Sequence, residues 1–249
     1  MDRNRVLAVI PARYSSTRFP GKPLAPIAGK PMVAHVVERA VEAGCFAEVI
    51  VATDDERIAR AAAAAGARPV MTGTCRSGTD RVAEAVRGMP AGAVLNVQGD
   101  EPALPPENLR LLAGFLRANP QAPMATLALP GTAADLDNPN VVKVVCDATG
   151  RALYFSRAPI PYPRNAVAGV VRRHVGLYGF QKPALLAFAA WEETDLERAE
   201  GLEQLRALAH GMALYVLAAA ADSVAVDVPA DIPRAEAALC SLLSQRQHP

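Results

Sequence analysis

Short, nearly continuous apolar runs alternate with longer segments of helical periodicity through the first half of the chain. The apolar runs lie at 6–10, 49–52, 70–71 and 94–97. A strand that is apolar at every position is buried on both faces of a sheet. Glycines such as Gly44 and Gly66 stand where the intervening helices would stop. Strands that alternate with helices predict βαβ units and a mostly parallel sheet.

The second half of the chain has a different rhythm. Four strand candidates follow one another with little helix between them, at 124–129, 141–146, 152–155 and 175–180. Helical periodicity returns at 183–191 and 196–209, followed by a strand at 213–217 and a terminal helix from about Ala230. We therefore expect an α/β protein in which 1–249 is one domain and about 124–180 contributes a smaller antiparallel subdomain.

Composition excludes several classes of protein. Hydrophobic residues make up 51% of the 249, which is too many for a disordered chain. The 26 basic and 25 acidic residues nearly cancel, which argues against a duplex nucleic-acid partner. The apolar stretch 213–221 has about half of the ~20 residues that a membrane span needs. Four scattered cysteines without metal-ligand spacing indicate free thiols and a cytoplasmic location.

The loop after the first strand is the first candidate site. No acidic residue occurs between positions 3 and 37, yet the loop carries Arg13, Ser16 and Lys22. In open α/β sheets, ligands bind beyond the carboxyl ends of the strands, and these side chains are suited to a polyphosphate. The loop contains neither GxxxxGK[ST] nor GxGxxG. The same residues would also fit an ordinary basic surface loop.

Two aspartates follow apolar runs and are candidate ligands for Mg²⁺, which takes carboxylate oxygens and usually accompanies polyphosphate. Asp100 stands in Gly-Asp-Glu-Pro directly after the predicted strand at 94–97. Asp227 stands in Val-Asp-Val-Pro before the terminal helix. Turn chemistry explains the first equally well, and a helix cap formed by Asp227 or Asp231 explains the second.

Two further groups are weaker on their own. Ser77, Gly78 and Thr79, followed by Arg81, form a donor-rich helix start that suits an anion or the polar edge of a base, although an N-cap explains Thr79 fully. The second group comprises polar side chains in the second half: Arg157, His174, Tyr178, Glu203 and Gln204. Taken alone, Glu203 and Gln204 lie off a leucine stripe and fit a solvated helix face.

Taken together, these segments resemble the CMP-Kdo synthetases, or 3-deoxy-manno-octulosonate cytidylyltransferases. The matching stretches are PARYSSTRFPGKPL at 11–24, VATDDERIA at 51–59, SGTDR at 77–81, NVQGDEP at 96–102, NPNVVKVVCDATGRALYFSRAPIP at 138–161, RHVGLYGF at 173–180, LEQLRAL at 202–208 and VDVPADI at 226–232. The resemblance extends from the first strand to the last helix, and the ordered set is far more specific than any single stretch.

The resemblance implies a Rossmann-like nucleotidyltransferase fold and a homodimer. It implies transfer of CMP from CTP to the anomeric hydroxyl of Kdo, an eight-carbon acid sugar of lipopolysaccharide, with release of pyrophosphate. It assigns catalytic roles to Arg13, Lys22, Asp100 and Asp227, with Mg²⁺ held by the two aspartates. Nucleotide binding falls to Arg13, Ser16, Lys22, Ser77, Gly78, Thr79 and Arg81. The sugar pocket falls to Gln98, Arg157, His174, Tyr178, Glu203 and Gln204, with Arg157 suited to the sugar carboxylate.

Two segments depart from the family pattern. The stretch 72–76 is slightly shorter than usual and lacks a histidine, and 161–173 is also short. The first concerns recognition of the base and the second the sugar side, where an amino-substituted Kdo could replace Kdo as the acceptor. Three competing functions are a CMP-sialate synthetase, whose first loop differs, a sugar-1-phosphate nucleotidyltransferase, whose first loop is richer in glycine, and a non-catalytic nucleotide-binding protein.

Overall fold

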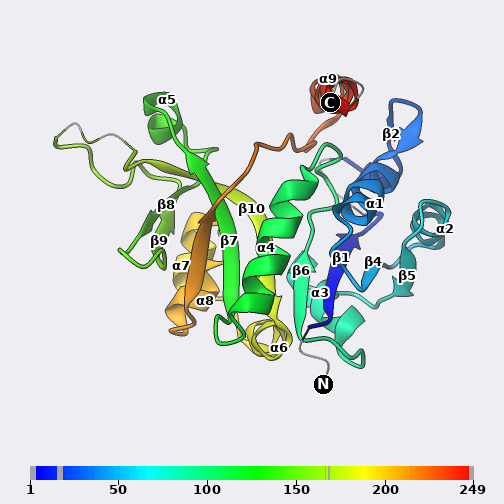
Figure 1. Ribbon diagram of the computed structural model, residues 1–249, viewed down its shortest axis with the longest axis horizontal. Helices are drawn as coiled ribbons and strands as arrows, with labels where there is room; N and C mark the ends of the chain where they lie inside the picture. The colour runs from blue at the N-terminus through cyan, green and yellow to red at the C-terminus, as the bar shows by residue number, and fades with distance from the viewer. Residues whose placement is uncertain (1–3, 16–18, 166, 168, 247–249) are drawn as a thin grey trace.

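The computed structural model describes residues 4–15, 19–165, 167 and 169–246. Its central sheet contains β1 (Val6–Ala12), β4 (Glu48–Thr53), β5 (Arg68–Met71), β6 (Ala93–Asn96), β7 (Met124–Pro130), β10 (Arg172–Gln181) and β11 (Leu214–Ala218). The strand order is β11-β7-β10-β6-β1-β4-β5 (Figure 1). β1 therefore lies inside the sheet, as its continuous apolar sequence requires.

The sheet is mostly parallel, as predicted. β1 pairs in parallel with β4 and β6, β4 with β5, and β11 with β7, whereas β10 runs antiparallel to both of its neighbours. Two further strands, β8 (Lys143–Cys146) and β9 (Ala152–Ser156), form an antiparallel pair that joins the sheet through β10. The region 124–180 thus supplies two strands of the central sheet and the smaller β8–β9 pair beside it.

Helices cover both faces of the sheet. One face is packed by α1 (Met32–Ala43), α2 (Glu56–Ala64) and α4 (Pro106–Ala118), and the other by α3 (Gly78–Val86), α6 (Lys182–Ala190) and α8 (Leu205–Ala209). Alternate residues of β1 contribute to each layer, because side chains on a strand point to opposite faces. Ile10 belongs to the first layer and Val9 to the second, and both side chains are fully buried.

The single helix predicted at 196–209 is wrong. The segment forms α7 (Asp195–Glu200) and α8, separated by Gly201 in a left-handed conformation with φ of 62°. Several short elements had no sequence prediction: β2 (Pro26–Ile27), β3 (Lys30–Pro31), α5 (Ala133–Asp137) and the 3-10 helices η1 (Lys22–Leu24) and η2 (Pro229–Asp231). The predicted terminal helix is α9 (Ile232–Arg246), which packs with residues of β2 and of the segment before η2 in a small third core.

The fold brings the candidate loops to one edge of the sheet. The parallel strands β1, β4 and β6 end near Ala12, Thr53 and Asn96, and the segments that follow them carry the charged motifs. Among the described residues, none of the helices has both the length and the hydrophobicity of a membrane span.

Candidate active site

A pocket of about 270 Å³ opens beyond the carboxyl ends of β1 and β6. Seven of the sequence-predicted residues lie on its wall: Arg13, Lys22, Ser77, Gly78, Arg81, Gln98 and Asp100. They come from the loop after β1, the start of α3 and the loop after β6. The parallel strand order therefore assembles the predicted phosphate loop, helix start and carboxylate around one cavity. Ser16 lies outside the described residues.

Lys22 lies at the centre of the charged part of this site. Its Nζ donates a hydrogen bond of 2.7 Å to Asp100 Oδ2 and one of 3.0 Å to the carbonyl oxygen of Val226. The same Nζ is 3.8 Å from Asp227 Oδ1. Two carboxylates that are 127 positions apart in the sequence thus face one cationic group. Asp227 is about half exposed and Asp100 is more enclosed.

The first turn of α3 forms another part of the pocket wall. Ser77 is its N-cap, since the Ser77 hydroxyl accepts a hydrogen bond of 3.1 Å from the backbone N–H of Asp80. Arg81 is buried and donates to Asp54 Oδ2 at 2.8 Å and to the Thr72 hydroxyl. Asp54 follows β4, so the sheet-edge argument that found Asp100 applies to it as well; the sequence prediction missed it.

Thr79 is not among the residues that line this pocket. Its hydroxyl donates a hydrogen bond of 2.5 Å to Glu203 Oε2 and accepts one of 3.0 Å from the amide of Asn96. Only 2% of Thr79 is exposed. The predicted nucleotide residue therefore joins α3 to the segment that carries Glu203, a role that only the three-dimensional contacts reveal.

A second pocket, of about 320 Å³, adjoins the first. The two cavities share Arg76 and Ser77, and Glu203 and Arg206 line the second. Burial raises the pKa of Glu203, while hydrogen bonds from Ser77 and Thr79 oppose that rise. Because Ser77 borders both cavities, ligands in the two would lie side by side.

His174 and Tyr178 form an aromatic row on β10. The imidazole of His174 lies edge-on to Phe155 at 5.0 Å and 5.4 Å from the Tyr178 ring, measured between ring centroids. Its Nε2 is 2.9 Å from the hydroxyl of Thr126. Loss of hydration lowers the pKa of His174 to about 3, so the ring is neutral at ordinary pH.

Of the other two residues predicted to bind the sugar, Arg157 is held by backbone carbonyls and Gln204 is buried. Arg157 Nε donates a hydrogen bond of 2.8 Å to the carbonyl of Glu200, and its Nη1 donates one of 3.1 Å to that of Pro139. Among the described residues, Arg157 lines neither of the two pockets. Gln204 is 3% exposed and precedes α8, and no described acceptor reaches its Nε2.

The short 72–76 segment borders the first pocket through Cys75 and Arg76. Burial and a hydrogen bond to Glu84 raise the pKa of the Cys75 thiol to about 11, so it is a neutral thiol at this wall. The 161–173 loop lies elsewhere, where Pro163 and Val170 face α5 across an apolar hollow. In the described residues, no group of three or more His, Cys, Asp or Glu side chains could hold a metal ion, so Asp100 and Asp227 remain a pair.

Comparison with known proteins is consistent with this geometry. The family model for cytidylyltransferases matches residues 7–214. The 3-deoxy-manno-octulosonate cytidylyltransferase of Anaeromyxobacter dehalogenans is 49% identical over 239 residues, which are 95% of this chain and 98% of that protein. The protein of the same name from Idiomarina loihiensis is 50% identical over 242 residues, which are 91% and 95% of the two chains.

Solved structures give the same result. The structure of CMP:2-keto-3-deoxy-manno-octonic acid synthetase complexed with CTP superimposes with a TM-score of 0.90 at 42% identity, over 95% of this chain and 99% of that one. A 4-diphosphocytidyl-2C-methyl-D-erythritol synthase from Anaerococcus prevotii matches with a TM-score of 0.64 at 15% identity, over 96% and 100% of the chains, and shows likeness of fold alone. The chain belongs to the cytidylyltransferase family, among the 3-deoxy-manno-octulosonate cytidylyltransferases.

Proposed function

We propose that this protein transfers CMP from CTP to the anomeric hydroxyl of Kdo and releases pyrophosphate, for lipopolysaccharide biosynthesis. The observation that carries the proposal is the basic pocket beside Lys22, with Asp100 and Asp227 facing the same ammonium. The family relatives and the CTP complex of a similar protein support the substrates.

In this proposal, positioning and charge neutralisation supply most of the catalysis. The sugar hydroxyl must approach an α-phosphorus that is surrounded by negative oxygens. Arg13 and Lys22 would hold those oxygens, and the N-terminal turn of α3 would orient the base and ribose. Gln98 lies on the same wall and would contact the sugar as it enters. A bound sugar that is held in line with the α-phosphorus needs less activation.

The residues present fit a divalent cation. Asp100 and Asp227 supply carboxylate oxygens, the ligands that Mg²⁺ prefers, and both face a point that already holds a positive charge, Lys22 Nζ. When bound, Mg²⁺ neutralises triphosphate charge and lowers the pKa of a coordinated hydroxyl. Lys22 would exchange its contact with Asp100 for phosphate oxygens of CTP.

The remaining assignments for the sugar are proposals of the same kind. Tyr178, His174 and Glu203 would form one side of the sugar site, and Gln204 would offer its amide. His174 would act as a hydrogen-bonding group, because its lowered pKa keeps it neutral. Arg157 would have to exchange a backbone carbonyl for the sugar carboxylate. We also place the enzyme in the cytoplasm, as a homodimer.

The deciding experiment measures pyrophosphate release from CTP with Mg²⁺ in parallel reactions containing Kdo, an amino-substituted Kdo, sialic acid or no acceptor. We expect release with Kdo only. Release with amino-substituted Kdo or with sialic acid instead would overturn the sugar assignment and leave the CTP site standing. Binding of CTP without release in any reaction would favour a non-catalytic nucleotide-binding protein.

A further inference from the structure

A buried ion pair joins the two short helices beside the second pocket. Arg206 on α8 donates two hydrogen bonds to Glu197 on α7, from Nε to Oε2 at 2.8 Å and from Nη2 to Oε1 at 2.5 Å. The two side chains are 6% and 8% exposed. The guanidinium also lies 4.8 Å from the centroid of the Phe188 ring. Such a bidentate pair fixes the guanidinium in one orientation.

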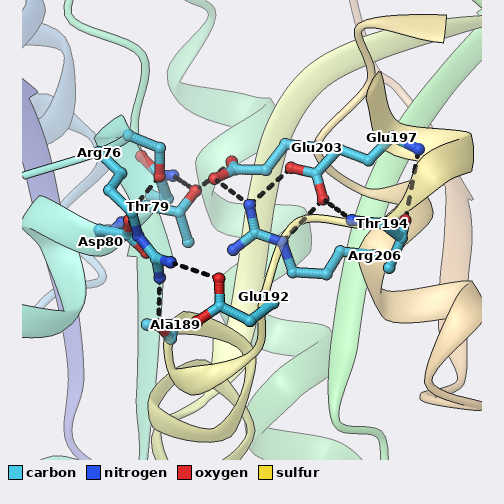
Figure 2. A network of polar contacts seen from close by, with 11 residues as sticks. Arg76, Thr79, Asp80, Ala189, Glu192, Thr194, Glu197, Glu203 and Arg206 are labelled. Atoms are coloured by element: carbon cyan, nitrogen blue, oxygen red, sulfur yellow. Dashed lines mark hydrogen bonds and ion pairs between the residues drawn. The ribbon is translucent and has the colours of Figure 1, made fainter. Parts of the chain in front are cut away.

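The same guanidinium reaches the polar network of the candidate site. Arg206 Nη2 is 3.8 Å from Glu203 Oε1, while the other oxygen of Glu203 accepts the Thr79 hydroxyl (Figure 2). The amide of Asn96 completes the series by donating to Thr79. A continuous set of charged and polar contacts therefore extends from α7, through α8 and α3, to the end of β6.

We propose that Arg206 is a positioning residue, which holds Glu203 against Thr79 and thereby couples the sugar side of the site to the nucleotide side. Glu197 fixes the guanidinium, the guanidinium fixes Glu203, and Glu203 fixes the first turn of α3. Ser77, two residues before Thr79, borders both pockets. This inference rests on the proposed function, since it assigns the second pocket to the sugar.

The charges around Glu203 make the coupling measurable through pH. Burial raises the pKa of Glu203, and Arg206 lowers it by Coulombic attraction, as do the hydrogen bonds from Ser77 and Thr79. Asp80 on α3 adds repulsion, and Tyr178 on β10 faces the same carboxylate. Weakening the contact with Arg206 raises the pKa of Glu203 further. The ionised form is then lost at a higher pH on the acid side of the activity profile.

The first test is Arg206→Lys. A lysine keeps a positive charge beside Glu197, so the fold is retained, but it lacks the planar guanidinium whose Nη2 contacts Glu197 and Glu203 together. We expect kcat/KM for the sugar to fall about tenfold or more, and the acid limb of its pH profile to move to higher pH. Arg198→Lys is the matched control, because Arg198 forms an exposed pair with Asp195 on α7. It should leave both readouts unchanged. Arg206→Lys with wild-type activity and pH profile would overturn the proposal.

A double-mutant cycle with Thr79→Val separates positioning from simple destabilisation. Valine removes the hydroxyl that donates a hydrogen bond to Glu203. The double variant of Thr79→Val and Arg206→Lys should therefore lose no more activity than Thr79→Val alone. Effects that multiply in the double variant would show that Arg206 acts independently of Glu203 and Thr79. Thermal denaturation of each variant identifies any loss of fold.

A binding measurement keeps this test separate from the proposed function. Titration calorimetry with CTP alone needs no turnover, and we expect Arg206→Lys to weaken CTP binding several-fold through α3. If the wild-type protein binds CTP but releases no pyrophosphate with Kdo, the proposed function fails while this readout remains. Unchanged CTP affinity together with unchanged kcat/KM would refute the coupling itself.

Discussion

At the scale of single residues, burial determines the charge of the His174 side chain. The imidazole is packed against Phe155 and Tyr178, and its Nε2 is paired with the Thr126 hydroxyl. The Thr126 oxygen also lies within hydrogen-bonding distance of the carbonyls of Val175 and Leu177, at 3.1 and 2.8 Å. A histidine in this environment is a fixed neutral group rather than a proton donor in catalysis.

His174 therefore makes stability depend on pH in a defined direction. Its pKa is about 3 in the folded protein and about 6.5 in an unfolded chain, so between these values the unfolded chain binds more protons. The contribution of neutral His174 to the free energy of unfolding is complete above pH 6.5. It is lost as the pH falls toward the folded-state pKa, by about 1.4 kcal/mol per pH unit. His174→Phe keeps a packed ring but has no group that titrates. Between pH 7 and pH 5 we therefore expect its free energy of unfolding to fall by about 2 kcal/mol less than that of the wild type. Urea unfolding of both proteins at the two pH values measures this, and equal losses would contradict it.

At the scale of the secondary-structure elements, sequence patterns were most informative where burial alone decides the structure. The runs around Val9, Ile50 and Val94 form central strands because only a strand between neighbours can bury every residue. The break between α7 and α8 was missed, because the leucine spacing at 202–208 continues the helical period past Gly201. A left-handed glycine ends a helix in a way that periodicity does not register.

The site residues that could be predicted from the sequence are those in the segments that follow a strand. Lys22, Gln98 and Asp100 line the pocket because parallel strands bring their carboxyl ends to one edge. The partners of Thr79 were not predictable, because Glu203 lies 124 positions away and the contact depends on how α8 packs. For the same reason the sequence offered no signal for the role of Arg206.

At Gly99 the backbone after β6 packs closely against the end of β1. A Cβ at this position would lie 2.8 Å from the carbonyl oxygen of Pro11, so the loop after β6 packs directly on the end of β1. We expect Gly99→Ala to cost about 1–3 kcal/mol of stability by overpacking and to lower activity by displacing Asp100. Gly114→Ala is the control, since nothing lies within 4 Å of its Cβ on α4, and it should gain about 0.5–1 kcal/mol. Thermal unfolding and pyrophosphate release measure both, and equal stability of the two variants would contradict the close approach.

For the whole molecule, Lys22 connects segments from three parts of the chain. It links the N-terminal loop to Asp100 in the middle and to Val226 and Asp227 near the end. The backbone N–H of Val226 also donates to the carbonyl of Asp100 at 2.9 Å. In Figure 1 the segment that leads to α9 crosses from β11 toward the blue N-terminal region. The proposed cation site therefore depends on the complete fold rather than on any local motif.

This arrangement predicts how ligands stabilise the protein. A ligand that binds only the folded state stabilises it, by about 2.7 kcal/mol at a concentration of 100 times its Kd, and so raises the melting temperature. We expect Mg²⁺ with CTP to raise it more than CTP alone, because Asp100 and Asp227 would hold the metal and the metal would neutralise triphosphate charge. Asp100→Asn and Asp227→Asn should lose this metal-dependent increment and almost all turnover, yet keep the shift from CTP alone through Arg13 and Lys22. Asp222→Asn, which removes an ion pair with Arg173 and keeps an oxygen for the backbone N–H of Ser223, should behave like the wild type. A full metal-dependent shift in both site variants would exclude the two aspartates as its ligands.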